Sequence, residues 1–240
     1  MIAIDAMDMP YRKLNETIRL SGEREVVVEH CLGQRYIGSG LSDSSIEIHG
    51  TAGNALGAYL NGAQITVMGN AQDATGDTMN DGRIIIHGSS GDATGYAMRG
   101  GRIFVRENAG YRAGIHMKAY EQKIPVLVIG GHAGSFLGEY QAGGLIIVLN
   151  LQNDPHPVGN FCGTGMHGGK IFLCGVAAPR QLPSQVLLQQ ADDAALEEIR
   201  EPVAEFCSYF GQDIDRVLGR SFYVLTPNTS NPYHQLYTHN

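Results

Sequence analysis

The sequence predicts an all-β fold, a parallel β-helix built from stacked short repeats. Aliphatic residues recur every 19 positions, at Ile46, Ile65, Ile84 and Ile103. Glycines keep the same step in two columns: Gly57, Gly76, Gly95 and Gly114, and Gly50, Gly69 and Gly88. A fixed period near 20 residues is typical of repeat architectures, in which each unit is too small to bury its own apolar face.

Within one repeat, a short strand is expected to precede a glycine-punctuated turn. Alternation predicts that Ile46 and Ile48 point inward and that Glu47 points outward. Fourteen positions after each aliphatic opener stand further apolar residues: Leu60, Met79, Met98 and Met117. We expect this column to lie in the core rather than to bind metal. The repeat leaves no room for a long helix between its glycines, which argues against βαβ units.

The chain is expected to have three parts. Residues 1–32 are predicted to form an N-terminal cap with a strand at 26–28, because the ends of repeat arrays need atypical closing units. Residues 33–178 are expected to form the repeat domain, with late strands at 125–129, 145–149 and 171–174. Residues 179–240 differ in composition and are predicted to form a small mixed α/β C-terminal extension.

Helix signals are concentrated in that extension. Asp192 and Asp193 are candidate N-caps of a helix that continues through Val203, with Pro202 expected to kink it or start a second segment. A short helix is expected at 213–218 and a last strand at 222–225. The polar, aromatic tail 231–240 is expected to be docked or disordered. This extension is expected to pack on the repeats or on a partner.

Composition narrows the function classes. The 240 residues carry a net charge of −7 without a basic block, so no nucleic-acid partner is expected. No apolar run of 18 residues is present and residues 1–10 do not form a signal peptide, so no membrane association is expected. The four cysteines are widely spaced, which favours reduced thiols in a cytoplasmic protein over disulfides, zinc or iron–sulfur ligation.

Four stretches resemble the GXGXG domain at the C-terminal end of the glutamate synthase large (alpha) subunit. They are Gly50-Thr51-Ala52-Gly53-Asn54-Ala55-Leu56-Gly57-Ala58, Gly69-Asn70-Ala71, Gly138-Glu139-Tyr140-Gln141-Ala142-Gly143-Gly144 and Gly159-Asn160-Phe161-Cys162-Gly163-Thr164-Gly165-Met166-His167-Gly168-Gly169. Their order and spacing fit over residues 33–175. The chain lacks the N-terminal nucleophilic cysteine, the FMN barrel and the cysteine cluster of the parent enzyme. It therefore resembles the stand-alone form of split, archaeal-type synthases.

The resemblance implies a right-handed parallel β-helix and a non-catalytic structural subunit. Such a subunit would hold a glutamine amidotransferase (glutaminase) subunit and an FMN-containing, iron–sulfur synthase subunit together while ammonia passes between them. FMN and iron–sulfur clusters are then expected in the partners and no cofactor in this chain. Related repeats occur in N-methylglutamate synthase and formylmethanofuran dehydrogenase, and an equivalent subunit of such a complex is the alternative. Self-association is left open.

Two glycine motifs invite a nucleotide-binding interpretation. Residues 163–168 match G-x-G-x-x-G, but a dinucleotide fingerprint must open a helix, and here a strand is expected to follow. Lys170 suggests a P-loop, yet Ile171 stands where Ser or Thr is required. We therefore expect no cofactor-binding residue.

Several polar residues are candidates for a catalytic or metal-binding role. His49 and His87 share a column but lie two repeats apart, about 10 Å if strands stack about 4.8 Å apart, too far for one metal. His132, His156 and His167 could converge only through folding. One column of polar turn residues is expected to bind local backbone donors rather than to form an acid/base pair: Asn54, Asp73 and Asp92. We expect no catalytic and no metal-binding residue in this chain.

Two functions from different classes remain. A scaffold subunit is favoured by the resemblance. A self-contained enzyme with an active groove would need clustered carboxylates and aromatic platforms. The chain has no tryptophan and carries glycines where such side chains would stand.

Overall fold

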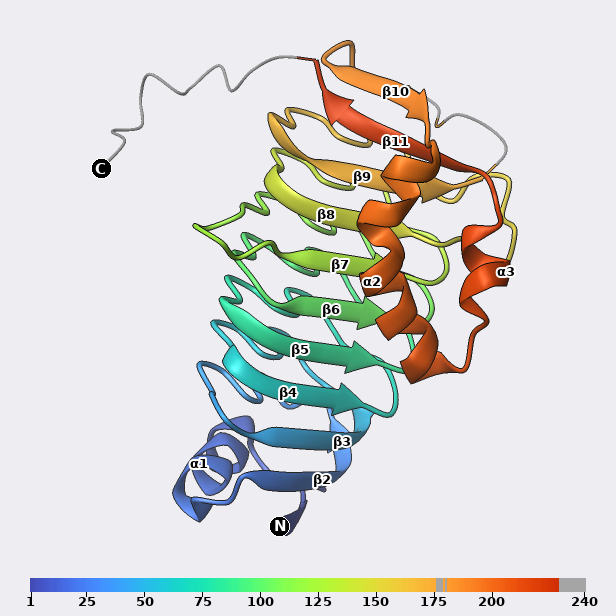
Figure 1. The fold of residues 1–240 in the computed structure, drawn as a ribbon. Coiled ribbons are helices and arrows are strands. Elements are labelled where there is room, and N and C mark those ends of the chain that lie inside the picture. The colour runs from blue at the N-terminus through green and yellow to red at the C-terminus, as the bar shows by residue number, and fades with distance from the viewer. Residues whose placement is uncertain (176–178, 180, 229–240) are drawn as a thin grey trace.

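The structure is a computed structural model that describes residues 1–175, 179 and 181–228 (Figure 1). The tail 231–240, for which a prediction was made, lies outside these residues. Within the described residues, eleven strands form one sheet in the order β1-β2-β3-β4-β5-β6-β7-β8-β9-β11-β10. All neighbours from β1 to β9 pair in parallel, whereas β11 pairs antiparallel with both β9 and β10. The strands are β1 Ile2–Asp5, β2 Glu25–Leu32, β3 Ser45–Thr51, β4 Asn61–Val67, β5 Asp81–Ile86, β6 Arg102–Val105, β7 Val126–Ile129, β8 Ala142–Val148, β9 Gly168–Cys174, β10 Val186–Gln190 and β11 Phe222–Pro227.

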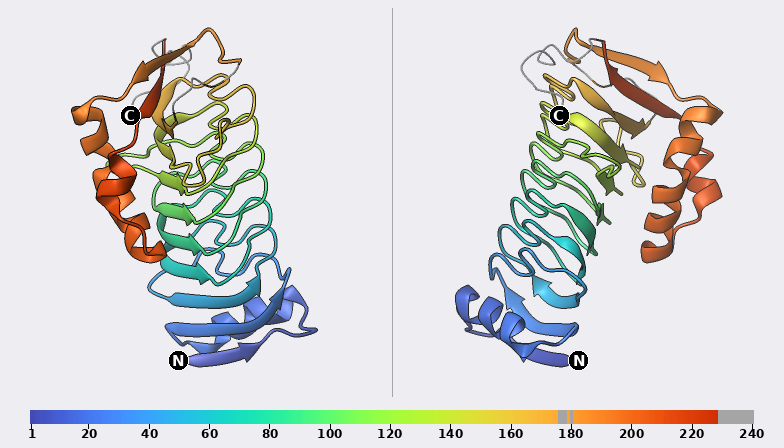
Figure 2. Two further views of the ribbon diagram at one scale, coloured as in Figure 1. Left: turned by 90° about the vertical axis from the view of Figure 1, so that its right-hand side faces the viewer. Right: turned by 60° about the vertical axis from the view of Figure 1, so that its left-hand side comes forward.

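The prediction of an all-β, right-handed parallel β-helix is wrong. The part of the chain that the structure describes forms a single, mostly parallel open sheet with three helices, α1 (Tyr11–Ser21), α2 (Asp193–Phe210) and α3 (Ile214–Leu218), and it resembles an α/β arrangement. Each repeat contributes one strand to one wall, and the segments that return to the next strand carry no second sheet (Figure 2). Those return segments consist of turns joined by isolated bridges, because their backbone leaves the extended region.

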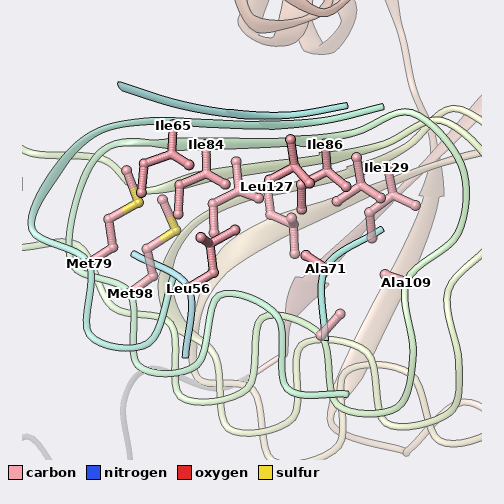
Figure 3. Close-up of a cluster of buried hydrophobic side chains, with 14 of the residues drawn as sticks. Leu56, Ile65, Ala71, Met79, Ile84, Ile86, Met98, Ala109, Leu127 and Ile129 are labelled. Atoms are coloured by element: carbon pink, nitrogen blue, oxygen red, sulfur yellow. The ribbon is translucent and has the colours of Figure 1, made fainter. Parts of the chain in front are cut away.

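The expected aliphatic ladder is confirmed. Ile46 pairs with Ile65, Ile65 with Ile84, and Ile84 with Ile103, and all four are fully buried. The ladder belongs to an inner core between the sheet and the return segments (Figure 3). The methionine column is also confirmed as core, since its members are fully buried: Met79, Met98 and Met117.

Left-handed turns build the return segments. In the repeat after β3, Ala55, Gly57 and Tyr59 all have positive φ, and later repeats show the same pattern. The amide of Ala55 donates to the Asp73 carbonyl in the following repeat (2.9 Å), while that of Gly57 donates to the Ile37 carbonyl in the preceding one (2.8 Å). Each turn is therefore bonded to both of its neighbours, which satisfies backbone groups that a buried turn could not leave unpaired.

Helix α2 covers the outer face of the sheet from β5 to β9 (Figure 1). It begins as expected, with the Asp192 carboxylate accepting from the Ala195 amide (2.8 Å). Pro202 does not divide it, because the helix continues to Phe210. Its buried side chains, among them Phe206, form an outer core with sheet residues such as Phe104.

Ion pairs add to this contact. Arg102 donates to Glu205 (2.6 Å) and to Glu201 (2.7 Å), and Arg83 also pairs with Glu205. Burial opposes ionisation of the Glu205 carboxyl, but hydrogen bonds from Arg83, Arg102 and Tyr209 outweigh it and lower its pKa. Charge therefore helps to fix which part of the sheet the helix covers.

Two elements at the N-terminus were not predicted. Strand β1 pairs with β2, and α1 packs Leu14 and Ile18 into the inner core. The helix was missed because Pro10 occupies its N-cap and no acidic residue stands in its first turn. The spacing of Leu14 and Ile18, followed by Gly22 as a left-handed C-cap, was the available signal.

Candidate functional site

Two departures from the 19-residue step mark the places where the chain builds more than stacked repeats. Ile103 pairs with Leu127, 24 positions later, and Ile146 pairs with Ile171, 25 positions later. Between them, Leu127 and Ile146 keep the step of 19. Insertions in repeat proteins commonly map to a binding face. Here each extra segment forms one wall of a cavity.

The second insertion, a loop at residues 150–157, closes a cavity of about 400 Å³ against the return turns. The loop is held firmly. Asn150 is buried, its amide donates to the Asp154 carbonyl (2.9 Å), and its side-chain oxygen accepts from the Asp154 amide (2.8 Å). Arg220, just before β11, donates to the carbonyls of Leu149 and Asn150 and to the side chain of Asn153. The cavity wall is therefore fixed from both sides of the chain.

The cavity presents hydrogen-bonding groups at its rim. His132 and His156 both line it and both are exposed. The Ser135 hydroxyl accepts from the Asn160 amide (3.0 Å), and the Asp154 carboxylate accepts from the His156 amide (2.7 Å). Within the described part of the chain, neither imidazole makes a hydrogen bond. The rim can bind a polar group, but it does not form a proton relay of the Ser-His-Asp kind.

The floor of the cavity is apolar and contains a thiol. Val158, Leu173 and Cys174 line it. Burial raises the pKa of Cys174, and burial raises the pKa of Cys162, a residue of the inner core, to about 12. Since the thiolate is the nucleophile, these cysteines are not activated for covalent catalysis.

The structure brings together two of the three loop histidines. His132 and His156 share the cavity, whereas His167 does not line it. His49 contacts Glu47 on the same strand (2.6 Å). His87 does not point freely outward, because its ring packs edge-on against Phe210 of α2 at 5.2 Å. Burial lowers the pKa of His87, and Arg106 adds to that effect.

The polar turn column acts between repeats. The Asp73 carboxylate accepts from the Asp92 amide (2.9 Å), and the Asp92 carboxylate accepts from the Tyr111 amide (2.8 Å). Both donors belong to the next repeat, so the expectation of local caps was wrong in its partner. A second column, Asn70 and Asn108, binds the amides of Ser89 and His132 in the same way. These side chains connect repeats.

An aromatic ridge, made of two stacks of side chains, lies on the return turns; the residues directly before Arg112, Phe136 and Phe161 line the cavity. We give this name to Tyr96, Arg112, His116, Phe136, Tyr140 and Phe161. Phe136 stacks on Phe161 at 5.2 Å, and Arg112 lies over the Phe136 ring at 5.1 Å. His116 stacks on Tyr140 at 5.2 Å. Tyr140 and Phe161 are 45% and 43% exposed, so ordered rings face solvent rather than the core.

Neither a metal cluster nor a membrane helix is found in the part of the chain that the structure describes. No three His, Cys, Asp or Glu side chains there are arranged to hold a metal ion. No helix there is long and apolar enough to cross a bilayer.

Comparison with known families decides the relationship. The model of the family described as the GXGXG motif matches residues 13–228. The chain belongs to the GXGXG motif family. This family membership confirms the GXGXG resemblance seen in the glycine stretches, while it leaves the assignment to glutamate synthase as a proposal.

The chain is also similar to one protein in sequence and to one solved structure in fold. A protein of Methanocaldococcus jannaschii, described as uncharacterized, is 45% identical over 251 aligned residues, which cover 99% of this chain and 96% of the relative. The fold is similar to a chain in the crystal structure of the formyltransferase/hydrolase complex (FhcABCD) from Methylorubrum extorquens in complex with methylofuran. The TM-score is 0.69 at 19% identity, with 92% of this chain and 89% of that chain covered. At that identity the likeness concerns the fold alone.

Proposed function

We propose that this chain is a non-catalytic scaffold subunit of a multi-subunit enzyme. The aromatic ridge carries the proposal. Aromatic and arginine side chains are enriched at the centres of protein interfaces, where Tyr, Trp and Arg supply much of the binding energy. Stacking pre-orders the rings of Phe136 and Phe161, so binding a partner would cost less side-chain entropy.

Backbone geometry supports the same role for the ridge. Arg112, Phe136 and Phe161 all have positive φ, a conformation that a large side chain adopts only with strain. Asparagine or glycine would serve the turn at lower cost. Arg112 and Phe161 are exposed and Phe136 is half-buried, so large side chains are kept at strained positions on the surface, which supports contact with another subunit.

Two complexes are candidates for the assembly. The sequence resemblance favours glutamate synthase, with a glutaminase subunit and an FMN-containing, iron–sulfur synthase subunit as partners. The fold comparison favours a related complex, because the similar chain occurs in a formyltransferase/hydrolase assembly. In either case, the chemistry and cofactors would reside in the partners, and this subunit would hold them in place.

The test is reconstitution with defined partners. The chain is mixed in turn with the glutaminase and synthase chains and with the formyltransferase/hydrolase chains of its own organism, and complexes are measured by size-exclusion chromatography with light scattering. A Phe136→Asn/Phe161→Asn variant should weaken the productive complex at least about tenfold, since truncating a hot-spot residue at the centre of an interface costs about 2 kcal/mol or more. Asparagine tolerates positive φ, so the variant should fold.

Tyr36→Asn is the matched control, because Tyr36 has φ +60° and is 48% exposed but lies near the N-terminal end, away from the ridge. It should leave assembly unchanged. Failure of the wild-type chain to bind either partner set, or substrate turnover by the chain alone, would contradict the scaffold role.

A further inference from the structure

The first insertion does not serve the stacking of repeats. Residues 118–124 leave the repeat after Met117 and return at β7, forming the green segment that projects between β6 and β7 in Figure 1. Its tip is a tight hairpin in which Tyr120 and Lys123 exchange backbone hydrogen bonds (3.1 and 2.9 Å). Glu121 within it has φ +53°, a strained conformation for a residue other than glycine.

This hairpin walls a second cavity, of about 410 Å³, at the edge where the strands begin. The cavity is separate from the one that His132 and His156 line. Its lining side chains are two tyrosines, two cations and two amides: Tyr59, Tyr120, Arg99, Lys123, Asn61 and Asn80. Asn61, Asn80 and Arg99 stand 19 residues apart, so three successive repeats supply the floor and the insertion supplies the wall.

The side chains that line this cavity carry two positive charges and no negative charge, in a protein that is acidic as a whole. Lys123 is partly neutralised, since its ammonium donates to the Asp81 carboxylate (2.8 Å), and that bond lowers the pKa of Asp81. Arg99 is exposed and forms no ion pair with any described residue. The Glu121 carboxylate is the other charge on the hairpin. Arg99 is therefore the cation whose charge is available to a ligand.

The uncharged side chains that line the cavity beside Arg99 are amides and phenols, which can donate hydrogen bonds. Among the described residues, the side-chain amides of Asn61 and Asn80 make no hydrogen bond, and Tyr59 and Tyr120 are 57% and 56% exposed. Tyr59 is held over the cavity at φ +58°. Amide and phenol donors around an arginine fork complement an oxyanion, because guanidinium binds carboxylate and phosphate oxygens in a bidentate way.

We propose that this cavity binds a small molecule through a carboxylate or phosphate group. Arg99 holds the oxyanion, Lys123 adds a second positive charge, and the tyrosine rings contact the rest of the molecule. The site is independent of the scaffold function, since the cavity and the aromatic ridge have no residue in common.

Isothermal titration calorimetry of the full chain at low ionic strength tests the proposal, with inorganic phosphate and succinate as probes and chloride as the reference anion. One molecule should bind per chain, and Arg99→Gln should weaken binding about tenfold or more, because it removes charge-assisted hydrogen bonds. Adding Lys123→Gln to that variant should weaken binding further, since this second substitution also leaves Asp81 unpaired beside the site. Binding of only one probe would identify the group as phosphate or carboxylate.

Arg106→Gln is the matched control. Arg106 is likewise exposed, and it lies just after β6, whereas Arg99 precedes that strand. It should change affinity less than about twofold. No binding of either probe at millimolar concentration, or equal losses for Arg99→Gln and Arg106→Gln, would overturn the proposal. Circular dichroism checks that each exposed substitution leaves the fold intact.

Discussion

Gly57 tests whether the glycine column exists for side-chain packing. It has φ +62°, and a Cβ at this position would lie 2.6 Å from Cδ1 of Ile84, which is fully buried in the ladder. Gly95 occupies the same column with φ +72°, but the nearest atoms to a Cβ there are 3.8 Å away. The two glycines therefore share backbone strain and differ in steric overlap.

The magnitudes follow from that difference. Alanine in the left-handed conformation costs roughly 1–2 kcal/mol at either position. Overpacking a buried site adds about 1–3 kcal/mol, and only Gly57→Ala incurs this term. We expect Gly57→Ala to lower the free energy of unfolding by about 2–4 kcal/mol and Gly95→Ala by about 1–2 kcal/mol.

Chemical denaturation monitored by circular dichroism measures both variants. The same pair is then made in an Ile84→Val background, which deletes the Cδ1 atom that a Cβ at position 57 would strike. There the cost of Gly57→Ala should fall toward that of Gly95→Ala, because Cδ1 of Ile65, 3.3 Å from the added Cβ, becomes the closest remaining contact. Equal costs in the wild-type background, or an Ile84→Val background that changes nothing, would refute the packing explanation and assign the glycines to backbone conformation alone.

Three further outcomes are expected. Glu205→Gln should destabilise by on the order of 1–2 kcal/mol, and Glu201→Gln, whose carboxylate is 75% exposed, by less than about 0.5 kcal/mol, as thermal unfolding at neutral pH would measure. Because the pKa of Glu205 is lowered in the fold, its contribution to stability is present above pH 4.5 and is lost as the pH falls through the folded pKa. Glu205→Gln should therefore reduce the dependence of stability on pH in that acidic range. The lowered pKa of His87 has the opposite origin: the unfolded chain binds the proton more readily, so stability should fall below about pH 7, and His87→Phe should reduce that slope in a pH series of denaturation midpoints. Asp73→Ala removes the bond to the Asp92 amide and should cost about 1 kcal/mol, with faster hydrogen exchange at that amide as the specific readout.

The spacing of apolar residues along the sequence was enough to predict which residues stack in the sheet. The ladder of Ile46, Ile65, Ile84 and Ile103 was predictable because stacked strands need apolar residues in register. The start of α2 was predictable because Asp192 is a local cap. Spacing alone does not report backbone conformation, and this is why the closed β-helix was wrongly expected.

The backbone conformation of the return turns could not be predicted from the sequence, as three alanines show: Ala55, Ala74 and Ala93. All three adopt positive φ, for which alanine has no preference, and hydrogen bonds between repeats offset the strain. The cavity was equally hidden. His132 and His156 line the same cavity because the loop that carries His156 is held in place, in part by Arg220 from a distant part of the chain, and no local pattern encodes the Arg220 bonds.

Because the parallel strands are evenly spaced, the length of the strand array is set by the number of repeats. Neighbouring strands lie about 4.8 Å apart, so the seven steps from β2 to β9 separate the two ends of the array by about 34 Å. Duplicating or excising one 19-residue unit between β3 and β6 would change that length by one strand spacing, while each remaining side chain kept its register. Distances between anything attached at the two ends can therefore change only in discrete increments, as on a ruler.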